Sequence, residues 1–375
     1  MDRHCLHHAG AAAHDAGADA VAVGAAVREG AGHGERAVAR GYPAADDGVG
    51  LVLAGVAPFG AEEEMAKLFV REVAAHLPLA TGEVGDRALG GGIGQQRRLG
   101  HVRIHRAGVD DAAARLQVRD RRLAQPEHGV EMADELENRI IALHGAANSA
   151  AVVIEPIACS TGVLVPPKGY LKRIRQICDR HQLLLIFDEV ITGFGRTGNM
   201  FASTTFDVVP DMILFAKTVT NGAAPLGGVI VKRSIHDALM QGPPHLSELM
   251  HGYTYSGHPL ACAAAIAMID VIEQENLIDQ VNTLSPYFEE AVHSLAELEQ
   301  VVSIRNFGLA AGIELRAKDG AFGQRGFQAQ ALAFKHGVLT RAPGDTLVLA
   351  PPFITTRSQI DQMIDGFKKA IQETT

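Results

Sequence analysis

The chain has 375 residues, enough for two or three domains, and a formal net charge of −9 at pH 7. That charge, with no basic stripe along the sequence, argues against a nucleic-acid-binding protein. The four cysteines lie far apart and form no CxxC pair, which favours a reducing compartment without a disulfide framework. The longest apolar stretch, residues 260–269, is shorter than the ~20 residues of a membrane helix, and no signal-peptide layout begins the chain, so we expect a cytoplasmic protein.

The first third of the chain, residues 1–125, has an unusual composition. It contains no serine, no asparagine and a single lysine, Lys67, although globular domains and the rest of this chain use serine and lysine freely. Helical periodicity is persuasive only over residues 61–76, and residues 48–55 fit a strand. We therefore treat residues 1–125 as an anomalous segment that is either poorly ordered or divergent.

Regular structure is expected from residue 126 onward. The pattern predicts a helix over residues 132–143, then a buried strand over 151–154 that ends at Glu155. A helix running to residue 181 and a second strand, which ends at Asp188, complete a right-handed βαβ unit. Open α/β sheets bind ligands at the carboxyl ends of their strands, so both carboxylates are placed for function. A loop-capping role for Glu155 is equally compatible with this position.

A lysine follows the next strand. After a glycine-rich turn over residues 192–198, the apolar strand 211–215 leads to Lys217, so that Asp188 and Lys217 follow neighbouring strands and face one crevice. A lysine can form a Schiff base with a carbonyl cofactor, and a buried carboxylate can keep a pyridine nitrogen protonated. Pyridoxal phosphate needs both groups. The alternative is that Asp188 caps a strand and Lys217 is a solvated surface lysine.

The remaining elements alternate between strand and helix. They are predicted as a strand over 228–231, a short helix over 235–240, a long helix over 258–275, a helix over 279–299, a strand over 309–315, a helix over 327–336, a hairpin of strands 338–341 and 346–349, and a last helix over 358–372. The long helix is rich in alanine, which allows close packing, so we interpret it as part of the core.

Three segments carry a family resemblance. Residues 188–198, with the sequence DEVITGFGRTG, resemble the signature of class III aminotransferases, which are fold-type I pyridoxal-phosphate enzymes. Residues 216–228, AKTVTNGAAPLGG, resemble the lysine segment of that family, and residues 251–264, HGYTYSGHPLACAA, resemble its third motif. All three follow the order and spacing of the family, and they are most similar to the ω-amino acid (β-alanine)–pyruvate branch.

The resemblance implies roles for residues around the cofactor ring. Lys217 corresponds to the Schiff-base lysine, which then acts as the general base, and Asp188 to the partner of the pyridinium nitrogen. Val190 would press on one face of the ring, although a core valine is an equally good interpretation. The chain departs from the family at Thr218, where relatives usually carry glycine, and a β-branched residue there requires an extended backbone.

The resemblance also implies groups that hold the cofactor phosphate and the substrate. Thr254 resembles the threonine that holds the phosphate across a dimer interface, which implies a homodimer with shared sites; an ordinary turn threonine is the alternative. Arg341 resembles the arginine that binds the substrate carboxylate, a task that suits the two-pronged guanidinium, although it can also be a surface arginine. Glu155 follows the strand that leads into the active-site floor, so we also expect it near the substrate.

The first third lacks two family features. Class III enzymes have a serine- and glycine-rich helix start that cradles the phosphate and an aromatic–histidine–glycine element that stacks on the ring, and neither occurs here. Our hypothesis is that residues before about 125 are translated from the wrong reading frame of a GC-rich gene. A genuine but divergent N-terminal domain is the competing interpretation.

These features together predict an α/β protein of fold type I. Its large domain, residues 126–285, would contain a mostly parallel seven-stranded sheet flanked by helices, and residues 286–375 a small α+β domain. The predicted function is pyridoxal 5′-phosphate-dependent transfer of an amino group from an ω-amino acid or amine, such as β-alanine, to pyruvate or another 2-oxo acid, without a metal. The alternatives are another enzyme on this scaffold, such as an aminomutase or racemase, and a non-catalytic chain that binds cofactor poorly.

Overall fold

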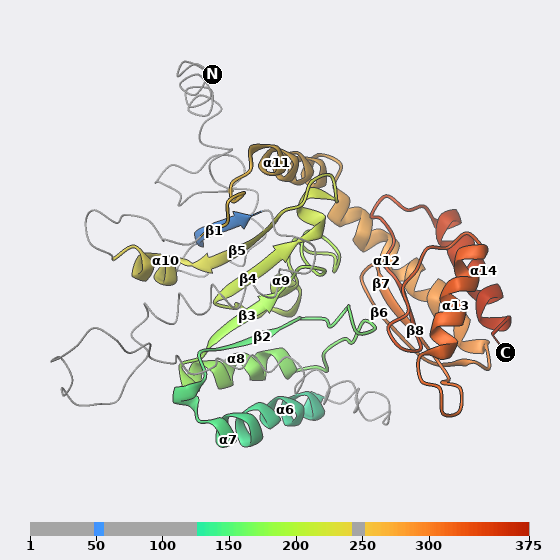
Figure 1. Ribbon diagram of the computed structural model, residues 1–375, viewed down its shortest axis with the longest axis horizontal. Helices are drawn as coiled ribbons and strands as arrows, with labels where there is room; N and C mark the ends of the chain where they lie inside the picture. Colours follow the sequence, from blue (N-terminus) through green and yellow to red (C-terminus); the bar gives the residue numbers. More distant parts are fainter. Residues whose placement is uncertain (1–48, 56–125, 242–251, 375) are drawn as a thin grey trace, which may run out of the picture.

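The computed structural model describes residues 49–55, 126–241 and 252–374. The expected helix over residues 61–76 lies outside the described residues. Figure 1 shows a large domain built around one sheet and a smaller C-terminal domain, with helix α12 running between them. The predicted boundary between residues 285 and 286 falls inside α12 and remains a prediction. No helix in the described ranges is long and apolar enough to cross a membrane.

The large domain contains a mixed sheet with the strand order β1-β5-β4-β3-β2. Strands β2, β3 and β4 are parallel, whereas β5 runs antiparallel to both β4 and β1. The strand expected over residues 48–55 is therefore present as β1, at one edge of the sheet. The expectation of seven strands extends to residues that are not described. The described strands are β1 Val49–Gly55, β2 Ala151–Ile154, β3 Leu184–Asp188, β4 Met212–Ala216 and β5 Gly227–Lys232.

Both faces of the central strands are buried, which explains their uninterrupted apolar sequences. Leu185 and Phe187 of β3 pack toward helices α6 and α8, while Ile186 between them joins a second cluster with β4 and β5. The large-domain helices are α6 Pro126–Glu135, α7 Ala142–His144, α8 Tyr170–His181, α9 Ala202–Phe206, α10 Arg233–Leu239 and α11 Pro259–Gln274. A π-helix, Leu136–Ile141, joins α6 to α7, so the helix expected over 132–143 is confirmed, whereas the short α9 was not predicted.

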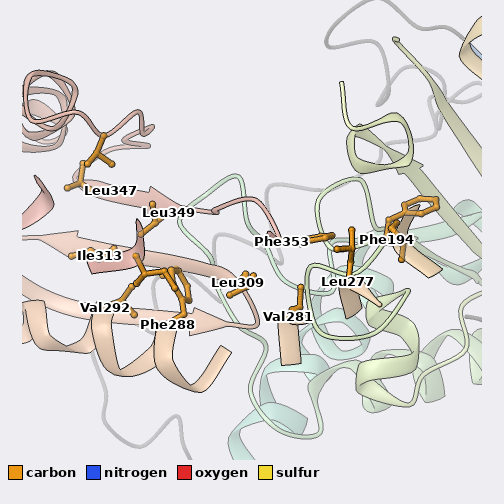
Figure 2. Close-up of a cluster of buried hydrophobic side chains, with 14 of the residues drawn as sticks. Phe194, Leu277, Val281, Phe288, Val292, Leu309, Ile313, Leu347, Leu349 and Phe353 are labelled. Carbon is orange, nitrogen blue, oxygen red and sulfur yellow. The ribbon is translucent and has the colours of Figure 1, made fainter. Parts of the chain in front are cut away.

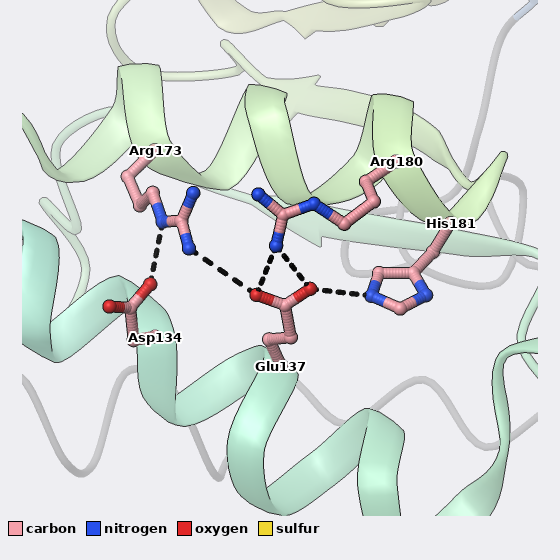
Figure 3. A network of polar contacts seen from close by, with 5 residues as sticks. All are labelled: Asp134, Glu137, Arg173, Arg180 and His181. Atoms are coloured by element: carbon pink, nitrogen blue, oxygen red, sulfur yellow. Dashed lines mark hydrogen bonds and ion pairs between the residues drawn. The ribbon is translucent and has the colours of Figure 1, made fainter.

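Ion pairs connect the α6 region to α8 on the outside of the domain (Figure 3). Arg173 binds Asp134 at 2.6 Å and Glu137 at 3.3 Å, and Arg180 and His181 each contact Glu137 at 2.7 Å. Both arginines in this set therefore have a carboxylate partner. We call these five residues the outer-face network.

The small domain places helices on a three-stranded antiparallel sheet in the order β6-β7-β8. Strand β6 was not predicted. Of the predicted hairpin, the strand over residues 346–349 is confirmed as β8, which pairs with β7. The strand over residues 338–341 is wrong, because these residues contribute only a single bridge, from Arg341 to Val348. The elements are α12 Leu277–His293, β6 Val301–Phe307, β7 Ala310–Leu315, α13 Gln324–Lys335, β8 Thr346–Leu349 and α14 Arg357–Gln372.

The cause of that error is a long-range contact of the turn between the two expected strands. The buried carboxylate of Asp345 accepts hydrogen bonds from the backbone N–H groups of Gly323 at 2.7 Å and Gly326 at 2.8 Å, at the start of α13. The amide of Ala342 also donates to the side chain of Gln330 on α13. These contacts hold the turn against α13, so the chain before it cannot run alongside β8 as a full strand.

One apolar core crosses from the large domain into the small one. Figure 2 shows this core from Phe194 of the large domain, through Leu277 and Val281 on α12, to Ile313 and Leu347 of the small sheet. Because burial of apolar surface drives packing, this continuity keeps the small domain in a defined position beside the end of the large sheet.

Candidate active site

Asp188 and Lys217 lie at the same edge of the large sheet. Strands β3 and β4 are parallel neighbours, with Asp188 paired to Leu214 in the register. Strand β3 ends at Asp188, and β4 ends at Ala216, directly before Lys217. The structure therefore brings the carboxylate and the amine to neighbouring strand ends, as the sequence predicted.

The backbone of Lys217 is in a conformation that few non-glycine residues adopt. Its φ angle is +55°, in the left-handed region, and it begins the 3₁₀ helix Lys217–Thr220. Such backbone strain concentrates at functional sites. The side chain is exposed, and within the described residues its amine forms no hydrogen bond or ion pair. The extended backbone expected at Thr218 is wrong: Thr218 belongs to the 3₁₀ helix, and the unusual conformation is one residue earlier.

Asp188 is half-buried, and its Oδ1 accepts a hydrogen bond from the backbone amide of Val190 at 3.1 Å. This contact folds the chain back at the strand end and orients the carboxylate. The side chain of Val190 is buried in a cluster with Met212, Leu214 and Ala216. That packing accounts for Val190 as a core residue, and its contact with a cofactor ring remains a prediction.

Glu155 and Cys159 are buried at the same end of the sheet. The side chain of Ser160 donates a hydrogen bond to Glu155 at 3.3 Å. The pKa of the Cys159 thiol is raised to about 12, mainly by burial and then by the negative charges of Glu155 and Asp188, while the positive charge of Lys217 opposes the rise. Glu155 directly follows β2, which runs parallel to β3, so it lies at the same edge of the sheet as Asp188 and Lys217. Sequence analysis missed Cys159, whose only signal was its position just beyond a strand end.

Glu189, next to Asp188, is a second buried ionisable residue to which the sequence analysis gave no role. Its carboxylate is fully buried and accepts hydrogen bonds from the backbone amides of Ala202 at 2.5 Å and Ser203 at 2.8 Å, and from the hydroxyl of Thr192 at 3.1 Å. Burial raises its pKa to about 7, although these hydrogen bonds act in the opposite direction. Glu189 thus holds the glycine-rich turn in place immediately after Asp188.

Thr254 and Arg341 lie farther from this cluster. Thr254 is exposed in a turn before α11, and α11 packs against the 3₁₀ helix that begins at Lys217. Within the described residues, its hydroxyl forms no hydrogen bond. Arg341 is exposed in the small domain, where its carbonyl accepts a hydrogen bond from the amide of Val348 at 2.9 Å. No hydrogen bond or ion pair within the described ranges connects Arg341 to Lys217.

The donor set fits a cofactor that carries a carbonyl and a basic ring nitrogen. The amine of Lys217 can engage the carbonyl, and the carboxylate of Asp188 can hold the protonated nitrogen. For a phosphate group on such a cofactor, the exposed hydroxyl of Thr254 is the candidate hydrogen-bond donor among the described residues. The described ranges contain no group of three or more His, Cys, Asp or Glu side chains that could hold a metal ion.

The sequence also matches a family model and characterised proteins. The model of the family described as Aminotransferase class-III matches residues 106–371. An omega-aminotransferase of Caulobacter vibrioides is 50% identical over 247 residues, which cover 66% of this chain and 56% of the relative. A beta-alanine–pyruvate aminotransferase of Pseudomonas aeruginosa is 46% identical over 65% of this chain and 54% of the relative. The chain therefore spans about half the length of these relatives.

Solved structures show the same fold. The omega transaminase from Pseudomonas jessenii in complex with PMP has a TM-score of 0.72 and 25% sequence identity over 100% of this chain and 86% of that one. The fold is therefore that of the fold-type I enzymes, in agreement with the prediction from the sequence.

Proposed function

The chain belongs to the class III aminotransferases, and we propose that it transfers an amino group from an ω-amino acid or amine, such as β-alanine, to pyruvate or another 2-oxo acid with pyridoxal 5′-phosphate as cofactor. The observation that carries this proposal is the free amine of Lys217 beside Asp188 at neighbouring strand ends. The names of both similar proteins support amino transfer, and that of the Pseudomonas aeruginosa relative supports pyruvate as the acceptor.

Lys217 and Asp188 would hold the cofactor, and Lys217 would also move the proton. When bound, pyridoxal phosphate supplies a carbonyl that can accept an amino group and a ring that withdraws electrons. Lys217 would hold the carbonyl end, and Asp188 would keep the ring nitrogen protonated. Nζ of Lys217 would also be the base that removes the proton from the substrate carbon bearing the amino group. Its exposed position leaves it free for this transfer.

The polar ends of the ligands require two further residues. In this proposal the hydroxyl of Thr254 binds the phosphate, and the guanidinium of Arg341 binds the carboxylate of the substrate through two parallel hydrogen bonds. In the same proposal, the buried Glu155 would lie on the substrate side, and Val190, packed in the core, would support the ring.

We also propose a homodimer. Tyr253 and Tyr255 flank Thr254 and are 41% and 63% exposed. Aromatic side chains of this size are enriched at protein interfaces, which supports contact of this turn with a second subunit. One chain has a mass of 39.8 kDa, and light scattering of the purified protein at micromolar concentration should give twice this mass. A monomer mass at that concentration would contradict the shared site.

The experiment that tests the proposed function is an absorbance titration of the purified chain with pyridoxal phosphate, before and after β-alanine is added. We expect a band of bound cofactor that shifts when the amine is added. The band is absent in Lys217→Ala. Asp188→Asn retains the band but loses most of the shift, because an amide cannot keep the ring nitrogen protonated.

The matched control is Lys335→Ala, which removes an exposed lysine of α13 in the small domain. It should behave like the wild type. A band that persists in Lys217→Ala, or a wild type that never forms one, contradicts the proposal. In the second case, resequencing the gene tests the reading-frame hypothesis for residues 1–125: an alternative frame that encodes a serine- and glycine-rich helix start supports it.

A further inference from the structure

Arg196, in the glycine-rich turn of the large domain, reaches into the small domain. Its Nη1 donates hydrogen bonds to two backbone carbonyls there, those of Leu309 at 3.0 Å and Pro351 at 2.6 Å. Its guanidinium carbon also lies 4.7 Å from the centre of the Phe353 ring. Figure 2 shows Phe353 on the side of the small domain that faces Phe194, close to Leu309. We call these contacts the interdomain seam.

The backbone of Arg196 takes part in the same contact. The amide of Leu309 donates to the carbonyl of Arg196 at 3.2 Å. The preceding residue, Gly308, has a φ angle of +53°, and a Cβ atom at that position would lie 2.3 Å from the same carbonyl oxygen. Only glycine permits this approach, so the turn before β7 is built to receive Arg196.

No carboxylate within the described residues forms an ion pair with Arg196. Carbonyl dipoles and an aromatic face bind the cation instead. Burial lowers the pKa of Arg196 to about 10, with a smaller opposing effect from Cys159, so the side chain is still charged at neutral pH. A cation in this setting depends on the position of its carbonyl partners and of the Phe353 ring, because no carboxylate among the described residues pairs with it.

On the large-domain side, Arg196 is firmly connected to Asp188. The amide of Gly193 donates to the carbonyl of Glu189 at 2.9 Å, and the side chain of Glu189 holds the far end of the turn. From α12, the side chain of Asn282 donates to the carbonyl of Gly198 at 2.9 Å. The turn is therefore a hydrogen-bonded block that begins at Asp188.

On the small-domain side, Arg196 is connected to Arg341. Its two carbonyl acceptors flank the end of the sheet where β7 and β8 pair, since Ala311 pairs with Leu349. The preceding residue of β8, Val348, donates its amide to the carbonyl of Arg341 at 2.9 Å. Arg196 thus binds Pro351, two residues beyond the end of β8, and β8 in turn is bridged to the backbone of Arg341.

We propose that Arg196 is a positioning residue that fixes the β8 end and Arg341 relative to Asp188, and so favours amino donors that carry a carboxylate. The inference rests on the proposed function, in which Arg341 binds that carboxylate. An amino group and a carboxylate on one small donor require their two protein partners at a set separation. A donor without a carboxylate has no such requirement.

The kinetic test compares β-alanine with propylamine, which has a similar length but no carboxylate. In Arg196→Met, which leaves both carbonyls without a donor, we expect the KM for β-alanine to rise about tenfold with little change in kcat, because uniform binding is lost. The KM for propylamine should change less than about twofold. Arg196→Lys should recover most of the β-alanine binding, since an ammonium keeps the charge and can donate to both carbonyls.

Hydrogen exchange in the full chain provides a readout that needs no turnover. In Arg196→Met, the amides of Leu309 and Val348 should exchange faster than in the wild type. The control is Arg173→Met, which removes an arginine of the outer-face network and should alter neither those amides nor the ratio of the two KM values.

Each other outcome counts against the inference. Equal losses for β-alanine and propylamine mean general damage, and unchanged exchange at Leu309 and Val348 means that Arg196 does not hold the β8 end. A wild type that turns over neither donor overturns the proposed function and donor selection together, whereas an active wild type with unselective variants overturns the inference alone.

Discussion

The outer-face network and the interdomain seam both hold charged side chains between packed elements, but the charges have different partners. In the network, Arg173 and Arg180 bind the carboxylates of Asp134 and Glu137 (Figure 3). In the seam and the turn behind it, Arg196 binds carbonyls and Glu189 binds N–H and hydroxyl groups. In the outer-face network the charges are paired with opposite charges, whereas in the seam and the turn they are stabilised by dipoles.

The difference appears in the direction of the pKa shifts. Burial without an opposite charge disfavours the ionised form, so the pKa of Glu189 is raised to about 7 and that of Arg196 lowered to about 10. In the network, the hydrogen bond from Arg180, followed by the contact with His181, lowers the pKa of Glu137. Ionisation is therefore favoured where partners are ions and solvent is near, and it is disfavoured where they are buried dipoles.

The largest expected effect is the loss of the buried carboxylate. In Glu189→Ala, the amides of Ala202 and Ser203 lose their acceptor inside the core, and we expect the free energy of unfolding at pH 6 to fall by about 4 kcal/mol. Urea denaturation followed by circular dichroism measures it. Glu189→Gln keeps one acceptor and should lose clearly less. Equal losses in the two variants would mean that the space filled by the side chain, not its hydrogen bonds, stabilises the turn.

The two regions should respond to pH in opposite directions. The folded pKa of Glu189 is raised from 4.5 to about 7, so its contribution to stability is complete below pH 4.5 and is lost as the pH rises through 7. Relative to Glu189→Gln, the free energy of unfolding of the wild type should fall by about 3 kcal/mol between pH 4.5 and pH 7. Glu137 has a lowered pKa, so its contribution is present above pH 4.5 and is lost as the pH falls through its folded pKa.

The measurement is the free energy of unfolding against pH for the wild type, Glu189→Gln and Glu137→Gln. Differences from the wild type cancel the titration of all other groups. A difference curve for Glu189→Gln that stays flat between pH 4.5 and 7 would show that its carboxyl has an ordinary pKa in the folded chain.

The smallest expected effect is in the outer-face network. Arg173→Gln breaks its contacts with Asp134 and Glu137, whose side chains are 29% and 18% exposed, and should cost about 1 kcal/mol because partly solvated ion pairs contribute little. The control is Arg139→Gln, whose partner Glu135 is nearly half-exposed and which should cause no measurable change. Adding salt should shrink the Arg173→Gln effect; insensitivity to salt would indicate packing of the arginine stem instead.

Much of the large domain could be predicted because its signals are local. The apolar runs that became β3 and β4 allow one interpretation, a strand buried on both faces, and parallel neighbours end at the same edge of a sheet. These signals predict that Asp188 and Lys217 lie at one edge of the sheet, and the strand register confirms it. The family signature then identified the chemistry, and the class III match agrees with it.

Errors occurred where a distant residue determines the local conformation. The expected hairpin before β8 is absent because Asp345 binds the start of α13 instead. At Thr218 the local rule was sound, but the unusual φ angle falls on Lys217, where β4 meets the 3₁₀ helix. The residues adjacent in the sequence carry no pattern that predicts either of these two conformations.

The order of most elements, the common sheet edge of Asp188 and Lys217 and the family could all be predicted from the sequence, because periodicity and motifs depend on residues close together in the chain. The partners of Glu189 and Arg196, in contrast, are visible only in the folded chain. Arg196 and Pro351 are separated by 155 residues, and a hydrogen bond between them exists only because folding brings the two domains together. A buried charge is stabilised by whichever dipoles surround it, and their identity depends on the fold.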